Sequence, residues 1–152
     1  MLFRSSRVFA QQVKTASEMG FAYIDTRAAR GGDYVGYYVW PKLGYDTFIS
    51  LRSYFENNIR NDNDQIKFNY LKKWLKKNNI DPEDDVNLSE IYACKAGNRF
   101  VGQELWYKFG NSEDMKFDLT PGSLSMRILE SYINLKSKKD NIDPSEFFSI
   151  DY

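Results

Sequence analysis

The order of a helix-forming segment, a glycine and a strand-forming segment at the start of the sequence most constrains the fold. Residues 5–19 carry Phe9 and Val13 four positions apart, as on one face of a helix. Gly20 can adopt the left-handed conformation that ends a helix. Residues 21–26 then form an apolar run typical of a buried strand. This order predicts an α/β fold, or α+β, and implies a neighbouring strand before residue 1.

Later segments predict a helix-rich chain with a small sheet. The alternation over residues 115–119 predicts a second strand, so we expect a sheet that includes residues 21–26 and 115–119. Apolar spacing predicts helices over 48–55, 64–77, 99–109 and 120–135. In the second of these helices we expect an inward stripe made of Ile66, Tyr70, Leu71, Trp74 and Leu75, and in the last an inner face made of Leu124, Ile128, Tyr132 and Leu135.

Composition excludes several kinds of site. Lys and Arg total 21, as do Asp and Glu, so the chain lacks the basic footprint of a nucleic-acid-binding protein. It has no histidine, and its one cysteine, Cys94, lies in an apolar run and is expected to be buried. We therefore expect no metal site, no internal disulfide and no His-based catalysis. No apolar stretch is long enough to cross a membrane, so we expect no membrane association and a cytoplasmic location.

Several segments together resemble the later part of the GNAT family of acyl-CoA-dependent N-acetyltransferases. Residues 3–20 are similar to the helix after the family's pyrophosphate loop, residues 21–26 to the next strand, and residues 37–46 to the short helix and turn of the type Tyr-x-x-Leu-Gly-Phe. Residues 102–110 and 117–125 resemble the C-terminal extension of acetyltransferase-like proteins in bacterial and phage genomes. The resemblance implies an acetyltransferase-like portion over 1–50 and a helical extension over 51–137, in one domain 1–137.

The resemblance also shows which parts of the family's machinery differ. The family binds the pyrophosphate with a glycine loop at a helix N-terminus, whereas residues 1–6 contain no glycine. The family's tyrosine that protonates the leaving thiolate corresponds to Trp40, counted back from Gly44. Tyr37 and Tyr38 are near enough to substitute, because a phenol with a pKa of about 10 suits a thiolate leaving group. The alternative is that both tyrosines only pack.

Two functions follow from these observations. The first is a non-catalytic binding or structural module on an acetyltransferase-like scaffold. We expect such a module to use no cofactor and to bind a protein partner or a second copy of itself, and a phage is one expected source of it. In a phage-encoded version, the location is the host cytoplasm or the virion. The second is an acyl-CoA-dependent N-acyltransferase, or its C-terminal part, which uses acetyl-CoA with Tyr37 or Tyr38 as the acid. Whether the chain is an enzyme stays open at this point.

The end of the sequence predicts a docking segment. Residues 138–152 form a polar linker and then a tail in which four apolar residues are too few to form a core of their own. We expect this tail to bind either its own domain or another molecule. The expected contact residues are Phe147, Phe148, Ile150 and Tyr152.

Overall fold

The computed structural model describes residues 2–140, with side chains described for residues 6–139. The chain is mixed α and β, mainly helical with short antiparallel strands, which is consistent with α+β, the second of the two predicted classes. It divides into two compact units. The first comprises Met1–Thr26, Lys42–Tyr45 and Lys116–Tyr152, and the second comprises Arg27–Pro41 and Asp46–Met115. We refer to them below as unit 1 and unit 2.

The helices of unit 1 are α1 (Leu2–Glu18) and α6 (Leu124–Asp140), which contact each other. Phe9 of α1 is buried and packs edge-on against Phe117, with 5.3 Å between the ring centroids. Gly44 has a φ of +115°, and a Cβ there would lie 2.5 Å from the Ser125 carbonyl oxygen and 2.6 Å from Phe117 Cε2. Glycine is therefore required at this turn for both its conformation and its size.

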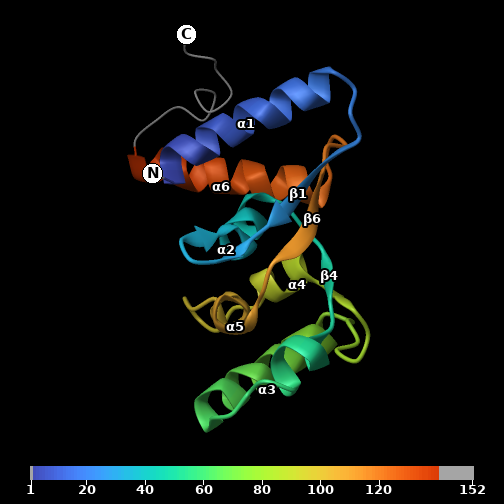
Figure 1. Ribbon diagram of the computed structural model, residues 1–152, viewed down its shortest axis with the longest axis vertical. Coiled ribbons are helices and arrows are strands. Elements are labelled where there is room, and N and C mark those ends of the chain that lie inside the picture. The colour runs from blue at the N-terminus through green and yellow to red at the C-terminus, as the bar shows by residue number, and fades with distance from the viewer. Residues whose placement is uncertain (1, 141–152) are drawn as a thin grey trace. The chain divides into compact units, whose positions relative to one another are not determined.

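Strands β1 (Tyr23–Ala28) and β6 (Glu113–Asp118) pair with each other, as Figure 1 shows. At one end of the pair, the Leu119 N–H donates to the Ala22 carbonyl at 3.0 Å. The prediction of strands near 21–26 and 115–119 is thus confirmed, each within two residues. The helix-ending role of Gly20, whose φ is +82°, is confirmed as well.

Two shorter strand pairs belong to unit 2. Strand β2 (Arg30–Gly31) pairs with β3 (Tyr34–Val35), and β4 (Phe48–Ile49) pairs with β5 (Val86–Asn87). The predicted helix over 48–55 is wrong in its first half, since Phe48 and Ile49 lie in a strand, and only Arg52–Glu56 forms a helical turn of the π type, η2. Residues 36–43 form the expected short helical segment, made of α2 (Gly36–Val39) and η1 (Trp40–Leu43).

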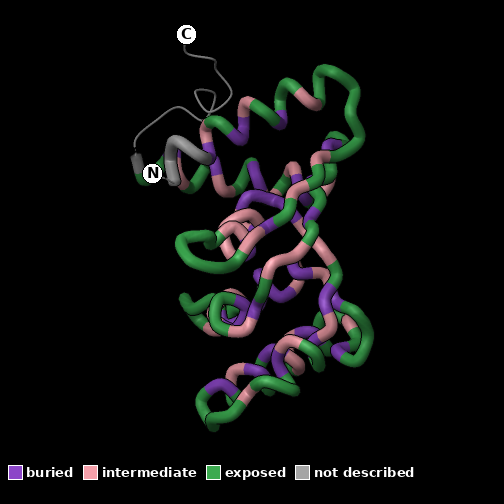
Figure 2. Tube along the Cα trace, in the orientation of Figure 1, coloured by how far each residue is buried: buried purple, intermediate pink, exposed green. Residues whose placement is uncertain are grey.

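The main helices of unit 2 are α3 (Asp62–Lys77), α4 (Leu88–Ala93) and α5 (Val101–Phe109). Asn61 caps α3 by accepting a hydrogen bond from the Asp64 N–H at 2.9 Å. Helix α3 contacts both α4 and α5. Its buried residues recur every three or four positions and so lie on one side of the helix, and the tube in Figure 2 changes between buried and exposed along α3.

The predicted inner face of α6 is wrong at its two ends. Leu124 is 43% exposed and Leu135 is 70% exposed, whereas Leu129 and Ile133 are buried. The buried series runs one position later than predicted at its first three residues and two positions later at its last, and it includes Ser125 and Ser137. The prediction counted only large apolar residues, and it therefore missed the buried face of α6, where serine occupies two of the positions.

Candidate functional site

The two tyrosines proposed as catalytic acids lie in an aromatic cluster of unit 2. Tyr37 is 3% exposed, and its hydroxyl donates to the Tyr107 carbonyl at 2.6 Å. Burial raises the pKa of Tyr37, with Tyr107 and Tyr38 raising it further and the nearby Arg30 opposing the rise. A hydroxyl that already donates to a backbone carbonyl, and that holds its proton more tightly than a free phenol, is poorly prepared to protonate a thiolate.

Tyr38 is half-buried in the same cluster. Its ring packs edge-on against Tyr107 with 4.9 Å between centroids, and its backbone carbonyl accepts the Tyr92 hydroxyl at 2.6 Å. Burial is the main cause that raises the pKa of Tyr92. These contacts of Tyr38 with other aromatic residues fit a packing role. Its role as an acid stays a prediction of the acyltransferase alternative.

Trp106 of α5 ties this cluster together. It is fully buried, and its Nε1–H donates to the Tyr37 carbonyl at 2.8 Å. Its ring also lies 4.8 Å from that of Tyr54, whose hydroxyl donates to Glu113. In a well-packed core, buried indole N–H and phenol O–H groups each find a hydrogen-bond acceptor, as these groups do.

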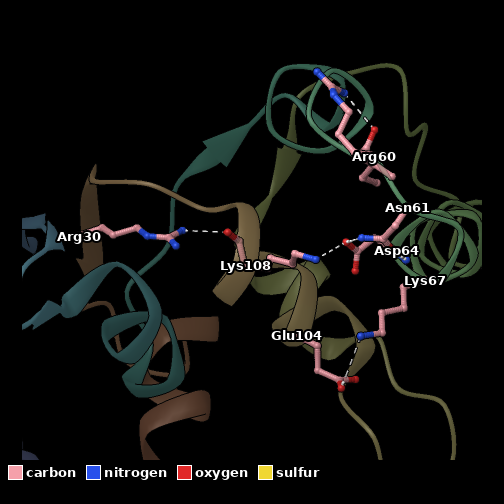
Figure 3. A network of polar contacts seen from close by, with 8 residues as sticks. Arg30, Arg60, Asn61, Asp64, Lys67, Glu104 and Lys108 are labelled. Carbon is pink, nitrogen blue, oxygen red and sulfur yellow. Dashed lines mark hydrogen bonds and ion pairs between the residues drawn. The ribbon is translucent and has the colours of Figure 1, made fainter.

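Polar side chains join the two ends of α5 to their neighbours, as Figure 3 shows. The Arg30 guanidinium donates to the carbonyls of Lys108 and Gly110, at 3.1 and 2.5 Å, and lies 4.8 Å from the Tyr37 ring centroid. A cation on the last carbonyls of a helix stabilises its C-terminus. This contact therefore holds the hairpin that carries Arg30 to the end of α5.

The Lys108 side chain extends the network to α3. Its ammonium donates to the buried Asp64 carboxylate at 2.5 Å, and the Asn61 side-chain amide donates to the same oxygen at 2.8 Å (Figure 3). The hydrogen bond from Lys108 is the main cause that lowers the pKa of Asp64. The carboxylate is therefore ionised at neutral pH, and its Oδ2 atom joins α3 to α5 through Lys108.

The other side of α3 carries exposed apolar residues. Ile66 is 67% exposed and Tyr70 is 38% exposed, while Trp74 is partly buried. Residues four apart lie on the same helix face, so the three form one stripe. The prediction that Ile66 and Tyr70 belong to the core is wrong, because Phe68, Leu71 and Leu75 are the buried residues.

This stripe continues across to the segment between α4 and α5. The Tyr70 hydroxyl donates to the Lys95 carbonyl at 2.8 Å. The Lys95 ammonium in turn lies 5.2 Å from the centroid of the Phe100 ring, which is 43% exposed. The two contacts link α3 to the 94–100 segment. We call this set the Tyr70 surface; its members are Ile66, Tyr70, Trp74, Lys95 and Phe100.

Charged residues surround the Tyr70 surface. Glu104 pairs with Arg99 at 2.6 Å and with Lys67 at 4.0 Å, as Figure 3 shows for the second pair. Lys73 and Lys77 lie on the same flank of α3 by helical spacing and are exposed. The surface thus has an apolar and aromatic centre and a mainly basic border.

Two kinds of site can be assessed over the part of the chain that the structure describes. Within it, no group of three or more Cys, Asp or Glu side chains is placed to hold a metal ion. None of the helices described is both long and apolar enough to cross a membrane. Cys94 is buried as predicted, and burial is the main cause that raises the pKa of its thiol to about 11.

The predicted docking residues fall outside the described residues. These are Phe147, Phe148, Ile150 and Tyr152, in the tail over 138–152, of which residues 138–140 are described and belong to α6. Comparisons of the chain with protein-family models, with curated proteins and with solved structures found no match. The chemistry of the Tyr70 surface therefore has to be inferred from its own residues.

The apolar residues of the Tyr70 surface on α3 are visible in the sequence, but the predicted stripe placed them in the core. The predicted stripe of α3 combined Ile66, Tyr70 and Trp74 with Leu71 and Leu75. The first three lie at spacing four, and so do the last two, but the two sets are one position apart and face different directions. Helix α3 thus has apolar residues on two faces, of which one is buried in the core of unit 2 and the other is exposed.

Proposed function

We propose that this chain is a non-catalytic protein-binding module, on a scaffold that resembles the later part of the N-acetyltransferase fold, and that it binds its partner through the Tyr70 surface. The observation that carries this proposal is the link from Tyr70 to Lys95 and from Lys95 to Phe100. It joins exposed apolar residues from two separate segments of unit 2 into one surface.

The composition of the Tyr70 surface fits protein recognition. Aromatic residues are enriched in the centres of interfaces, and charged residues belong to their borders. Tyr70 and Phe100 are each less than half exposed, so they are already positioned before a partner arrives. A fixed aromatic side chain loses little conformational freedom on binding, which favours affinity. Their further burial would contribute at about 25 cal/mol per Å² of apolar surface.

The acyltransferase alternative has less support from the same unit. It needs a phenol free to give a proton, and the Tyr37 hydroxyl is buried and bonded to the Tyr107 carbonyl. We therefore place the function in binding and treat acetyl-CoA as the ligand whose binding would argue for the alternative.

The test is a selection of peptides from a displayed random library on the purified full chain. We expect enrichment of peptides that combine aromatic and acidic residues, because these complement the aromatic centre and basic border. Tyr70→Ala with Phe100→Ala should weaken their binding about tenfold or more, as truncation at an interface centre does. Phe48→Ala is the matched control, since Phe48 is also exposed (65%) but lies on β4.

Two outcomes would contradict the proposal. One is that no selected peptide distinguishes the wild type from the Tyr70→Ala, Phe100→Ala variant. The other is that calorimetry shows saturable binding of acetyl-CoA and that a separate thiol assay shows release of free thiol when an amine is present. The second result would favour the acyltransferase, and Tyr37→Phe and Tyr38→Phe would then identify the acid.

A further inference from the structure

The exposed side of α3 changes in charge from one end of the helix to the other. Asp62 is its first residue and Lys77 is its last, and both are exposed. Ile66, which is 67% exposed, follows Asp62 by four residues, and the exposed Lys73 follows it by eleven, about three helical turns. These side chains therefore lie along one side of α3. This side is acidic at its beginning, apolar in the middle and basic at its end.

The residues of this side are placed almost evenly about Tyr70. Ile66 lies four positions before Tyr70 and Trp74 lies four positions after it, while Asp62 lies eight before and Lys77 seven after. When two identical helices pack antiparallel about a two-fold axis, residues equally far from the axis on opposite sides lie opposite each other. With the axis at Tyr70, Ile66 of each copy lies opposite Trp74 of the other, and Asp62 comes within one position of Lys77. A parallel arrangement would instead bring Asp62 to Asp62 and Lys77 to Lys77.

The other charges of the Tyr70 surface are compatible with an antiparallel pair. Around its apolar centre lie five basic and two acidic side chains, which are Lys67, Lys73, Lys77, Lys95, Arg99, Asp62 and Glu104. Glu104 is shared between Lys67 and Arg99 within one copy. Lys73 lies on the same flank as Lys77, so Asp62 of a second copy would meet a basic flank. The chain as a whole has equal numbers of basic and acidic residues, so two copies repel each other only weakly at long range.

We propose that the partner of the Tyr70 surface is a second copy of this chain, bound in a symmetric dimer whose two α3 helices pack antiparallel with Tyr70 at the two-fold axis. This inference rests on the proposed function and names the partner for its surface. Charges at the two ends of a helix pair fix its orientation, and here the Asp62–Lys77 contacts favour the antiparallel one. The 16 residues of α3 are about 24 Å long. A contact of one such helix pair is smaller than the about 1,200–2,000 Å² of standard interfaces, so we expect a weak dimer.

The first test is sedimentation equilibrium of the full chain. Because a contact of this size is weak, the protein is measured from about 10 μM to about 1 mM. We expect a reversible equilibrium between monomer and dimer over this range. Ile66→Ser should raise the dissociation constant about tenfold or more, as truncation at an interface centre does. Phe48→Ser is the matched control and should leave the constant unchanged, since Phe48 is 65% exposed but lies on β4.

A charge exchange tests the orientation. Asp62→Lys alone and Lys77→Asp alone should each weaken the dimer, because each places like charges opposite each other at both contacts. The two changes in one chain should restore it, since each new lysine then meets a new aspartate of the second copy. Both changes oppose the helix dipole of α3, so damage to the helix would add up in the double variant and could not produce recovery. Asp85→Lys and Lys14→Asp make the same changes in net charge at exposed positions outside α3 and should have little effect.

The outcomes separate the inference from the proposed function. If the wild type stays monomeric at the highest concentration, or if Ile66→Ser leaves association unchanged, the inference is wrong. A double charge variant that dimerises no better than the single ones would also overturn it. Peptides from the displayed library that still require Tyr70 and Phe100 would then leave the proposed function standing. If the chain does not dimerise through α3 and no peptide requires the surface, both fail. Where the dimer forms as expected, the same peptides should dissociate it, because they compete for one surface.

Discussion

The sharpest structural prediction concerns Gly102, in the first turn of α5. A Cβ atom at residue 102 would lie 2.8 Å from the Ile91 carbonyl carbon and 3.1 Å from Ile91 Cγ2, and nearer still to the carbonyl oxygen. Favourable carbon–carbon contacts lie at about 3.5–4.0 Å. The carbon–carbon contact alone would require α4 and α5 to separate by roughly 0.7 Å. The nearer Ile91 carbonyl oxygen requires a larger separation.

The expected cost follows from two opposing effects. Overpacking a well-packed contact costs about 1–3 kcal/mol, whereas alanine is favoured over glycine in an open helix by about 1 kcal/mol. The difference is about 0–2 kcal/mol, and we expect Gly102→Ala to lower the free energy of unfolding by about 1–2 kcal/mol, because the close contact is with backbone atoms that cannot rotate away. For a chain of this size, that corresponds to a fall in Tm of about 2–8 °C.

Urea denaturation followed by tryptophan fluorescence, with thermal melts followed by circular dichroism, measures this change. Gly102→Ser and Gly102→Val should be progressively worse than Gly102→Ala, since each adds volume at the same contact. Lys76→Ala, exposed on α3, is the control and should change stability by less than about 0.5 kcal/mol. A Gly102→Ala protein as stable as the wild type, or more stable, would refute the packing argument and leave only helix propensity. Because Gly102 lets α5 begin against the end of α4, the same variant should also weaken peptide binding at the 94–100 segment.

Three further predictions follow from the buried polar groups. Trp106→Phe should cost about 1–3 kcal/mol, because it leaves the buried Tyr37 carbonyl without the donor now 2.8 Å away; a loss below about 0.5 kcal/mol in urea denaturation would contradict this. Because the pKa of Asp64 is lowered in the folded state, the Asp64–Lys108 pair stabilises the fold fully at pH values above the ordinary carboxyl pKa. This stabilisation is lost as the pH falls through the pKa of Asp64 in the folded protein. An NMR titration of the Asp64 side-chain carbon should therefore show a higher pKa in Lys108→Gln than in the wild type, and an unchanged value would exclude Lys108 as the cause. Cys94, whose pKa is raised to about 11 by burial, should react with a disulfide reagent at pH 8 only after unfolding, whereas rapid reaction of the native protein would place the thiol at the surface.

Local signals in the sequence determined much of the secondary structure. The end of the first helix at Gly20, the strands near 21–26 and 115–119, and the burial of Cys94 all follow from residue type and short-range spacing. These features depend on backbone conformation and on runs of a few residues, which act before distant segments meet.

Tertiary contacts decided which apolar residues became core and which became surface. Helix α3 has apolar residues on two faces, and periodicity by itself cannot choose between them. The choice is made by the elements that pack on α3, which include α4, α5 and Phe55 of η2. On α3, Phe68, Leu71 and Leu75 are buried, and Ile66 and Tyr70 are exposed. In the same way, the side-chain type of Tyr37 allows a role as an acid, but its hydrogen bonds depend on α5. The Tyr37 hydroxyl donates to the Tyr107 carbonyl, and the Tyr37 carbonyl accepts from the Trp106 indole. The physical reason is that burial depends on partners dozens of residues away in the chain, whose positions no local pattern records.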